Sequence, residues 1–202
     1  MTDEFVPENF EKIELKLDQT KATLFQLAFW AAIVLVFGTL FFLVQPITPA
    51  ELFATMRPSS VTEALQRFGV VLVIAIVGII VHELLHAAFY LPYTKHGFKS
   101  LKIGFKLPSH AYCECTEIIR TSQAIVSLMA PTVILGVMPA IVAIIIGNAC
   151  LLLFGIFFTV AGAADTQIFL QLFKERKTTW FEDKASILKF YVHKPAQHNL
   201  NI

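Results

Sequence analysis

The feature that most limits how this chain can fold is an uncharged stretch of 44 residues, from position 121 to position 164. As one helix it would be about 66 Å long, which is twice the ~30 Å hydrocarbon core of a bilayer. The stretch must therefore turn back once, and Gly147 and Asn148 near its middle form a turn signal. This pattern predicts one membrane span over about 123–146 and another over about 149–173.

Two more apolar stretches precede it. Residues 22–50 carry no charge and predict a first span over about 25–45, and residues 68–91 predict the second. Pro131 and Pro139 should kink the third span. The chain is 56% hydrophobic and only 15% charged, with a mean hydropathy of +0.67, whereas a soluble domain carries about 25% charged residues. The predicted fold class is an all-α polytopic membrane protein with four transmembrane helices.

The basic residues predict how these spans are oriented. Three Lys or Arg precede the first span, two lie between the first and second, five between the second and third, none in the Gly147 turn, and six follow the fourth. Under the positive-inside rule, both termini lie in the cytoplasm. The predicted parts are a cytoplasmic N-terminal segment 1–21, a membrane domain 22–173 and a cytoplasmic tail 174–202. A net charge of +1 gives no indication of nucleic acid as a partner.

The cytoplasmic segment between the second and third spans contains a β pattern. Residues 101–107 alternate apolar with polar residues or glycine, Pro108 and Ser109 signal a turn, and residues 111–116 can alternate back. We therefore predict a cytoplasmic β-hairpin over about 101–116, with a solvated loop as the alternative. A hairpin beside a membrane bundle would offer a strand edge to an extended peptide.

The second span carries three ionisable residues, His82, Glu83 and His86, in an H-E-x-x-H pattern. On a helix the two imidazoles lie on one face and can bind one Zn²⁺, while Glu83 can act as general base on zinc-bound water. Charged groups inside a membrane are costly, so an apolar span does not carry three of them without a compensating partner. The alternative is that the three side chains only hydrogen-bond to neighbouring helices.

A catalytic zinc site of this kind needs a third protein ligand, for which Asp165 is the candidate. Counted from the cytoplasmic ends of their spans, Asp165 and the histidine pair lie at the same depth within about one helical turn. The small residues 161–164 before it would let two helices approach closely. Asp165 could instead reach the membrane surface, with a third ligand from outside the spans. The competing ligands are His110, Glu114, Glu117 and Asp183.

Other polar residues give weaker signals. His110 and Tyr112 could donate hydrogen bonds to a developing oxyanion. Cys113 and Cys115 would lie on one face of a strand and could bind a soft metal, although an isolated C-x-C pair more often binds nothing. With three cysteines in the chain, no disulfide framework is expected. The remaining histidines, His96, His193 and His198, have the pattern of ordinary exposed residues.

Taken together, these motifs resemble a bacterial family of four-span membrane proteins described as putative zincin peptidases. The resemblance covers about 70–183. It rests on the H-E-L-L-H core, on His-Ala-Tyr-Cys from His110, on Leu-Met-Ala-Pro ending at Pro131, on Gly-Ala-Ala-Asp ending at Asp165, and on the acidic pair Glu182 and Asp183. The chain is also loosely similar to site-2 proteases, although it lacks their Asn-Pro-x-x-x-x-Asp-Gly run. The resemblance implies zinc, an intramembrane active site, peptide-bond hydrolysis and a location in the bacterial cell membrane.

The sequence thus predicts a zinc-dependent intramembrane peptidase whose substrates are membrane-embedded or membrane-adjacent proteins or peptides. His82, His86 and Asp165 are the predicted metal ligands, and Glu83 is the predicted catalytic base. The alternative is a non-catalytic metal-binding scaffold or sensor that binds a partner helix. A metal-ion transporter would need charged groups spread through the membrane, whereas here they lie at one level. The sequence predicts no particular oligomeric state.

Overall fold

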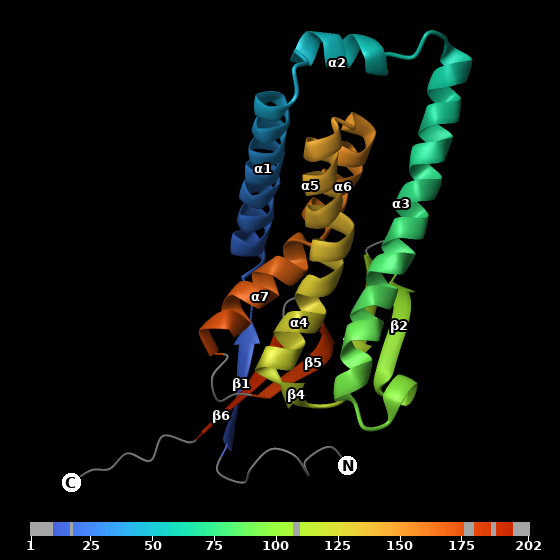
Figure 1. Cartoon of the computed structure of the whole chain (residues 1–202). Coiled ribbons are helices and arrows are strands. Elements are labelled where there is room, and N and C mark those ends of the chain that lie inside the picture. Colours follow the sequence, from blue (N-terminus) through green and yellow to red (C-terminus); the bar gives the residue numbers. More distant parts are fainter. Residues whose placement is uncertain (1–9, 17, 107–109, 176–179, 187–188, 196–202) are drawn as a thin grey trace, which may run out of the picture. The chain divides into compact units, whose positions relative to one another are not determined.

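The computed structural model describes residues 10–16, 18–106, 110–175, 180–186 and 189–195. Most of its helices and strands are labelled in Figure 1. They form two compact units. Unit 1 contains the described residues among 1–25, 83–130 and 164–202, and unit 2 contains residues 26–82 and 131–163.

Most of the predicted spans correspond to long apolar helices. Among the described residues, Gln19–Val44, Val61–Tyr93 and Thr121–Ile146 are long and apolar enough to cross a membrane, and a bent pair, Ala149–Ala161 with Ala163–Phe173, could be a fourth crossing. The number, length and composition of these helices are consistent with the predicted multi-pass membrane protein. The α-helices are α1 (Gln19–Val44), α2 (Pro49–Met56), α3 (Val61–Tyr90), α4 (Thr121–Pro131), α5 (Met138–Ile146), α6 (Ala149–Ala161) and α7 (Ala163–Glu175).

The turn between α5 and α6 lies where the sequence predicts it. Gly147 ends α5 in the left-handed conformation, with φ at 72°, which glycine adopts without steric cost. The side chain of Asn148 accepts a hydrogen bond from the Leu151 N–H at 3.0 Å and so caps the start of α6. The two helices pack with α1 in the core of unit 2, which contains Phe37, Phe41, Ala140, Ala143, Ile144 and Leu152.

The third predicted span changes its hydrogen-bond pattern between its two prolines. Residues Thr132–Val137, labelled η3, form a π-helical segment, and the Met138 N–H donates to the carbonyl of Val133, five residues back. Pro131 and Pro139 have no N–H to donate, so the regular α-helical ladder is interrupted at both. The sequence predicts the places of these interruptions but not their π-helical form.

The predicted fourth span is not one straight helix. It consists of α6 and α7, which are bent by 53° at Gly162. A Cβ atom at Gly162 would lie 2.0 Å from the hydroxyl oxygen of Thr132, so only glycine fits this close approach. The residues after the bend include Asp165, Thr166 and Gln167, and they are more polar than α6. The bend therefore falls where the chain changes from apolar to polar.

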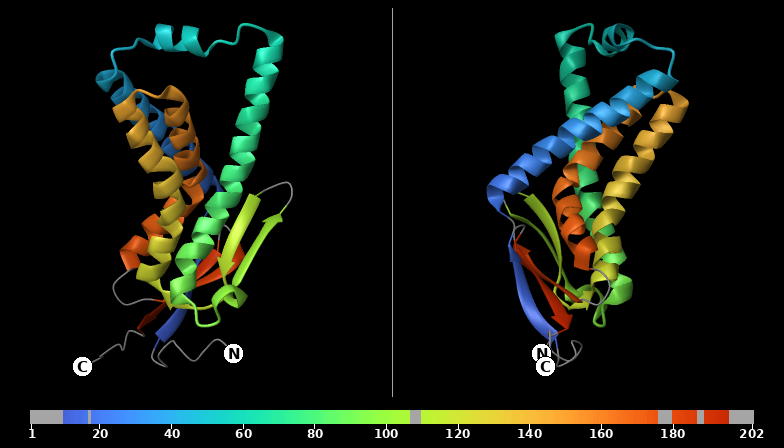
Figure 2. Two further views of the ribbon diagram at one scale, coloured as in Figure 1. Left: turned by 45° about the vertical axis from the view of Figure 1, so that its right-hand side comes forward. Right: turned by 90° about the vertical axis from the view of Figure 1, so that its left-hand side faces the viewer.

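The predicted all-α fold with one hairpin omits a four-stranded antiparallel sheet. Unit 1 contains this sheet, with its strands in the order β1-β6-β5-β4. Strands β1 and β6, from the two ends of the described chain, lie side by side (Figure 2). The sequence predicts no strands in the terminal segments, because the partners of these strands are far apart in the chain. The strands are β1 (Phe10–Lys16), β4 (Ile119–Arg120), β5 (Trp180–Ser186) and β6 (Lys189–Pro195).

Two more strands, β2 (Leu101–Lys106) and β3 (His110–Cys115), pair antiparallel in unit 1. They lie within the range 101–116 expected for a hairpin, while the side of the membrane on which they lie stays a prediction. Cross-strand pairs place Leu101 opposite Cys115 and Ile103 opposite Cys113 on one face. On this face, Cys115 belongs to the core of unit 1, and Leu101 and Cys113 pack against it. The buried members of that core are Tyr90, Cys115, Ile119, Ala124, Leu128, Leu172 and Phe181.

Candidate metal centre

Helix α3 holds the two predicted histidine ligands. It runs without a proline from Val61 to Tyr90, and His82 and His86 lie one turn apart on the same face. Their side chains are buried, with exposed fractions of 7% and 5%. Glu83 is half-buried and Leu84 is exposed, so the histidines lie on the inner face of the helix. Buried imidazoles on an otherwise apolar helix need polar partners.

Asp165, in the first turn of α7, is the partner of His86. Its Oδ2 atom lies 3.5 Å from the Nε2 atom of His86, and its side chain is half-buried. One ligand atom from each of His82, His86 and Asp165 lies within 4.8 Å of the others. Ligands about 2.1 Å from one tetrahedral ion are about 3.4 Å apart. The three side chains are therefore close enough to hold a single ion after small movements.

The other ring nitrogen of His86 is also engaged. Its Nδ1 atom lies 2.9 Å from the backbone carbonyl oxygen of Ser127 on α4. A carbonyl only accepts hydrogen bonds, so Nδ1 carries the proton and donates it. In the neutral ring, Nε2 then has a free lone pair directed toward Asp165, which is the state required of a metal ligand. No sequence motif marks Ser127, because this residue contributes through its backbone.

Of the competing third ligands, the two whose side chains the structure describes, Glu114 and Glu117, do not join this group. Among the residues whose side chains the structure describes, His82, His86 and Asp165 form the one group of at least three that is placed to hold a metal ion. Glu114 is buried on β3 and Glu117 is engaged elsewhere. The side chains of His110 and Asp183 lie outside the described part of the chain.

The Glu117 carboxylate binds the loop that follows α3. It accepts hydrogen bonds from the backbone N–H groups of Lys95 at 2.8 Å and His96 at 3.1 Å, from the Nδ1 of His96 at 2.8 Å and from the Ser100 hydroxyl. Burial tends to raise the pKa of Glu117, but these donors outweigh it and hold that pKa at about 2. Glu117 therefore organises the loop.

Neither cysteine of the C-x-C pair is placed as a metal ligand. Cys115 is 1% exposed within the core of unit 1, and Cys113 packs against that core. Tyr112, proposed as an oxyanion donor, is half-buried on β3. These positions agree with the alternative in which the cysteine pair binds no metal and is part of a packed strand.

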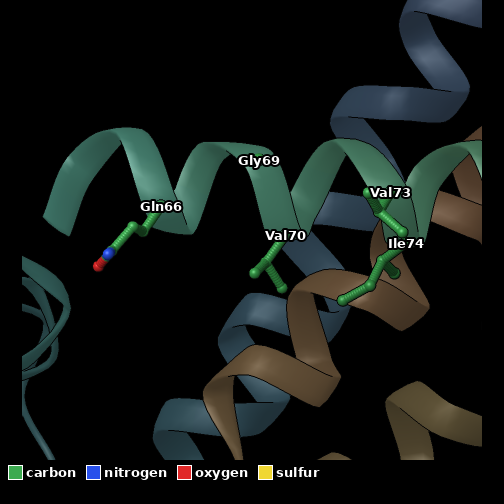
Figure 3. Close-up of a pocket in the computed structure, with 5 residues that line it drawn as sticks. All are labelled: Gln66, Gly69, Val70, Val73 and Ile74. Atoms are coloured by element: carbon green, nitrogen blue, oxygen red, sulfur yellow. The ribbon is translucent and has the colours of Figure 1, made fainter. Parts of the chain in front are cut away.

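A separate hollow lies along α3 within unit 2. It is lined by Gln66, Gly69, Val70, Val73 and Ile74 (Figure 3). These residues precede His82 by 8 to 16 positions, and none of them is ionisable. This apolar hollow therefore offers no second set of reactive groups.

Comparison with known proteins gives a family match. A family model described as putative zincin peptidase matches residues 75–180, which is 106 of the 202 residues. The matched range contains His82, Glu83, His86 and Asp165. No curated protein and no solved structure shows a significant match to the chain.

Proposed function

Because the chain belongs to the putative zincin peptidase family, we propose that it is a zinc-dependent peptidase that hydrolyses peptide bonds at a site within the membrane. The observation that carries this proposal is the cluster of His82, His86 and Asp165 on helices of a multi-pass membrane protein. The family name supports the peptidase activity. The position of the cluster on an apolar helix supports the intramembrane site.

The donor set fits zinc. Two neutral imidazoles and one carboxylate are a common set of three protein ligands in catalytic zinc sites, which keep a further position open. The carboxylate of Asp165 would partly neutralise the charge of the ion in surroundings of low dielectric. When bound by these three side chains, Zn²⁺ would polarise the scissile carbonyl and lower the pKa of a water molecule toward about 7.

Glu83 is the proposed general base. It is half-buried and follows His82 directly on α3, and this neighbouring position brings it close to the ligand cluster. Glu83 is not itself a member of the cluster of His82, His86 and Asp165. In the proposed reaction the Glu83 carboxylate accepts a proton from the attacking water and then passes it to the leaving amine. Glutamine at this position would keep the size of the side chain and remove the base.

The proposed substrates are proteins or peptides embedded in the membrane or lying against it. A helical substrate must be extended before attack, because its carbonyls are engaged in hydrogen bonds. Among the described strands, β2 pairs only with β3, so its other edge can take a substrate strand. The exposed side chains of Ile103 and Phe105 on β2 would contact that strand.

The test is cleavage of a single-span substrate co-expressed with the protein, together with metal analysis of the purified protein. We expect about one zinc per chain and substrate cleavage in the wild type. We expect Glu83→Gln to retain zinc and lose cleavage by a factor of about 10² or more. Glu63→Gln, the same change in the first turn of α3, is the matched control and should cleave normally.

Two results would contradict the proposal. Cleavage by Glu83→Gln at the wild-type rate would reject the role of Glu83 as base. A wild type that binds zinc and a partner helix but never cleaves it would favour the scaffold or sensor.

A further inference from the structure

The backbone carbonyl of Ser127 lacks the donor that a regular α-helix would give it. In an α-helix the carbonyl of residue i accepts from the N–H of residue i+4, which for Ser127 is Pro131. Proline has no N–H, so this bond of the helix cannot form. Ser127 is 0% exposed, and a buried carbonyl without a donor destabilises the fold. Another donor must therefore take the place of the missing N–H.

His86 supplies that donor. Its Nδ1 atom lies 2.9 Å from the Ser127 carbonyl oxygen, although the two residues are 41 positions apart in sequence. We propose that Pro131 is a positioning residue of the metal centre. By lacking an N–H, Pro131 leaves the Ser127 carbonyl to accept the Nδ1 proton of His86, which fixes the orientation of the ring with Nε2 toward Asp165. This inference rests on the proposed zinc site but not on peptide hydrolysis.

The side chain of Ser127 makes a second link between the same two helices. Its hydroxyl lies 2.9 Å from the carbonyl oxygen of Phe89 on α3 and 3.1 Å from that of Gln123, one turn earlier on α4. Two contacts from one residue, to His86 and to Phe89, fix the register of α4 along α3. The Ser127 carbonyl is thereby held opposite the histidine ring. Pro131, which is also fully buried, then keeps that carbonyl free of a competing helical N–H.

The predicted effect is on metal affinity. Hydrogen bonds that orient a metal-binding histidine typically change metal affinity by about 10–100-fold when they are removed. Pro131→Ala restores an N–H that can bond to the Ser127 carbonyl and compete with His86. Pro139→Ala removes the other proline of the same span, 12 positions after Ser127, and is the matched control.

The experiment measures the zinc dissociation constant of the full-length protein in detergent by competition with a chromophoric chelator. We expect Pro131→Ala to bind zinc about 10–100-fold more weakly than the wild type and Pro139→Ala to bind it within about 2-fold. Wild-type affinity in Pro131→Ala would overturn the inference while leaving the proposed function intact. A wild type that binds no zinc would overturn the proposed function and this inference with it.

A second measurement needs no folded proline variant. Nitrogen-15 NMR of the metal-free wild type, with His86→Gln to assign the signals, reports which ring nitrogen of His86 carries the proton. We expect a proton on Nδ1 that exchanges slowly with solvent, and in Pro131→Ala a faster exchange of that proton. A wild-type ring protonated only on Nε2 would overturn the proposal, whatever the affinities are.

Discussion

At the scale of single residues, the carboxylate of Asp165 decides whether the histidine pair is a metal centre. Its Oδ2 lies 3.5 Å from His86 Nε2, and it is the one acidic member of the cluster. Asp165→Asn keeps the shape and removes the charge, so we expect the bound zinc to fall from about one per chain to a small fraction of that. Mass spectrometry of metals in the purified protein measures this.

Asp18→Asn is the control for Asp165→Asn. Asp18 is an exposed residue before α1 whose carboxylate accepts a hydrogen bond from the Lys21 N–H at 3.0 Å. This variant should retain the full zinc content. Full zinc content in Asp165→Asn as well would remove Asp165 from the ligand set and leave the histidines without their proposed third partner.

The three candidate ligands were predictable from sequence for a physical reason. The spacing of His82 and His86 is a helical turn, and the rise per residue predicts Asp165 at the same level as the two histidines, which agrees with the proximity of the three side chains. The role of Ser127 was not predictable, because every residue has a backbone carbonyl. From the sequence, Pro131 was predicted only to kink the helix. That it leaves the Ser127 carbonyl to His86 depends on which helix faces Ser127, and the sequence does not show this.

At the scale of elements, the loop between α3 and β2 depends on the ionisation of Glu117. The folded-state pKa of about 2 lies below the ordinary value of 4.5 for this group. The stabilisation is therefore complete above about pH 4.5 and is lost as the pH falls toward 2. We expect the hydrogen-exchange protection factors of the Lys95 and His96 amides, which correct for the intrinsic rate at each pH, to fall over this interval.

Glu117→Gln separates this effect from general acid unfolding. Without a titrating carboxyl, the two amides should be less protected at neutral pH, and their protection factors should no longer fall between pH 4.5 and 2. An unchanged pH profile in the variant would show that another group controls the loop.

The bend between α6 and α7 makes a separate prediction about stability. A Cβ at Gly162 would lie 2.0 Å from the Thr132 hydroxyl oxygen, so Gly162→Ala should lower the free energy of unfolding by about 1–3 kcal/mol. Gly38→Ala is the control, because nothing lies within 4 Å of a Cβ there. That variant should be neutral or slightly stabilising in α1. Equal melting temperatures for both variants would contradict the close approach.

Helices were more predictable than strands for a related reason. A membrane span is a local property of about 20 residues, so α1 and α3 follow from composition alone. The pairing of β1 with β6 joins Phe10 to Pro195 across nearly the whole chain, and no local period reveals such a partner. The bend at Gly162 depends on Thr132, which is 30 positions away.

At the scale of the whole molecule, the pairing of β1 with β6 constrains the number of crossings. Strand β1 ends three residues before α1 begins, and β6 follows the last helix of the chain. Since the two strands belong to one sheet, we propose that the segments at both ends of the membrane helices lie on the same side of the bilayer, which requires an even number of crossings. We therefore propose that α6 and α7 together complete a fourth crossing, in agreement with the basic-residue count.

The side of the α5–α6 turn tests this topology directly. With both termini in the cytoplasm, the turn at Gly147 and Asn148 lies on the outer side, and the exposed Cys150 follows it immediately. A membrane-impermeant thiol reagent should label Cys150 in intact cells, whereas Cys150→Ser should stay unlabelled because Cys115 is buried and Cys113 is half-buried. Labelling only after lysis would place the turn inside and reverse the orientation. The proposed site would then open toward the outer face, because His82 lies 8 residues before the end of α3.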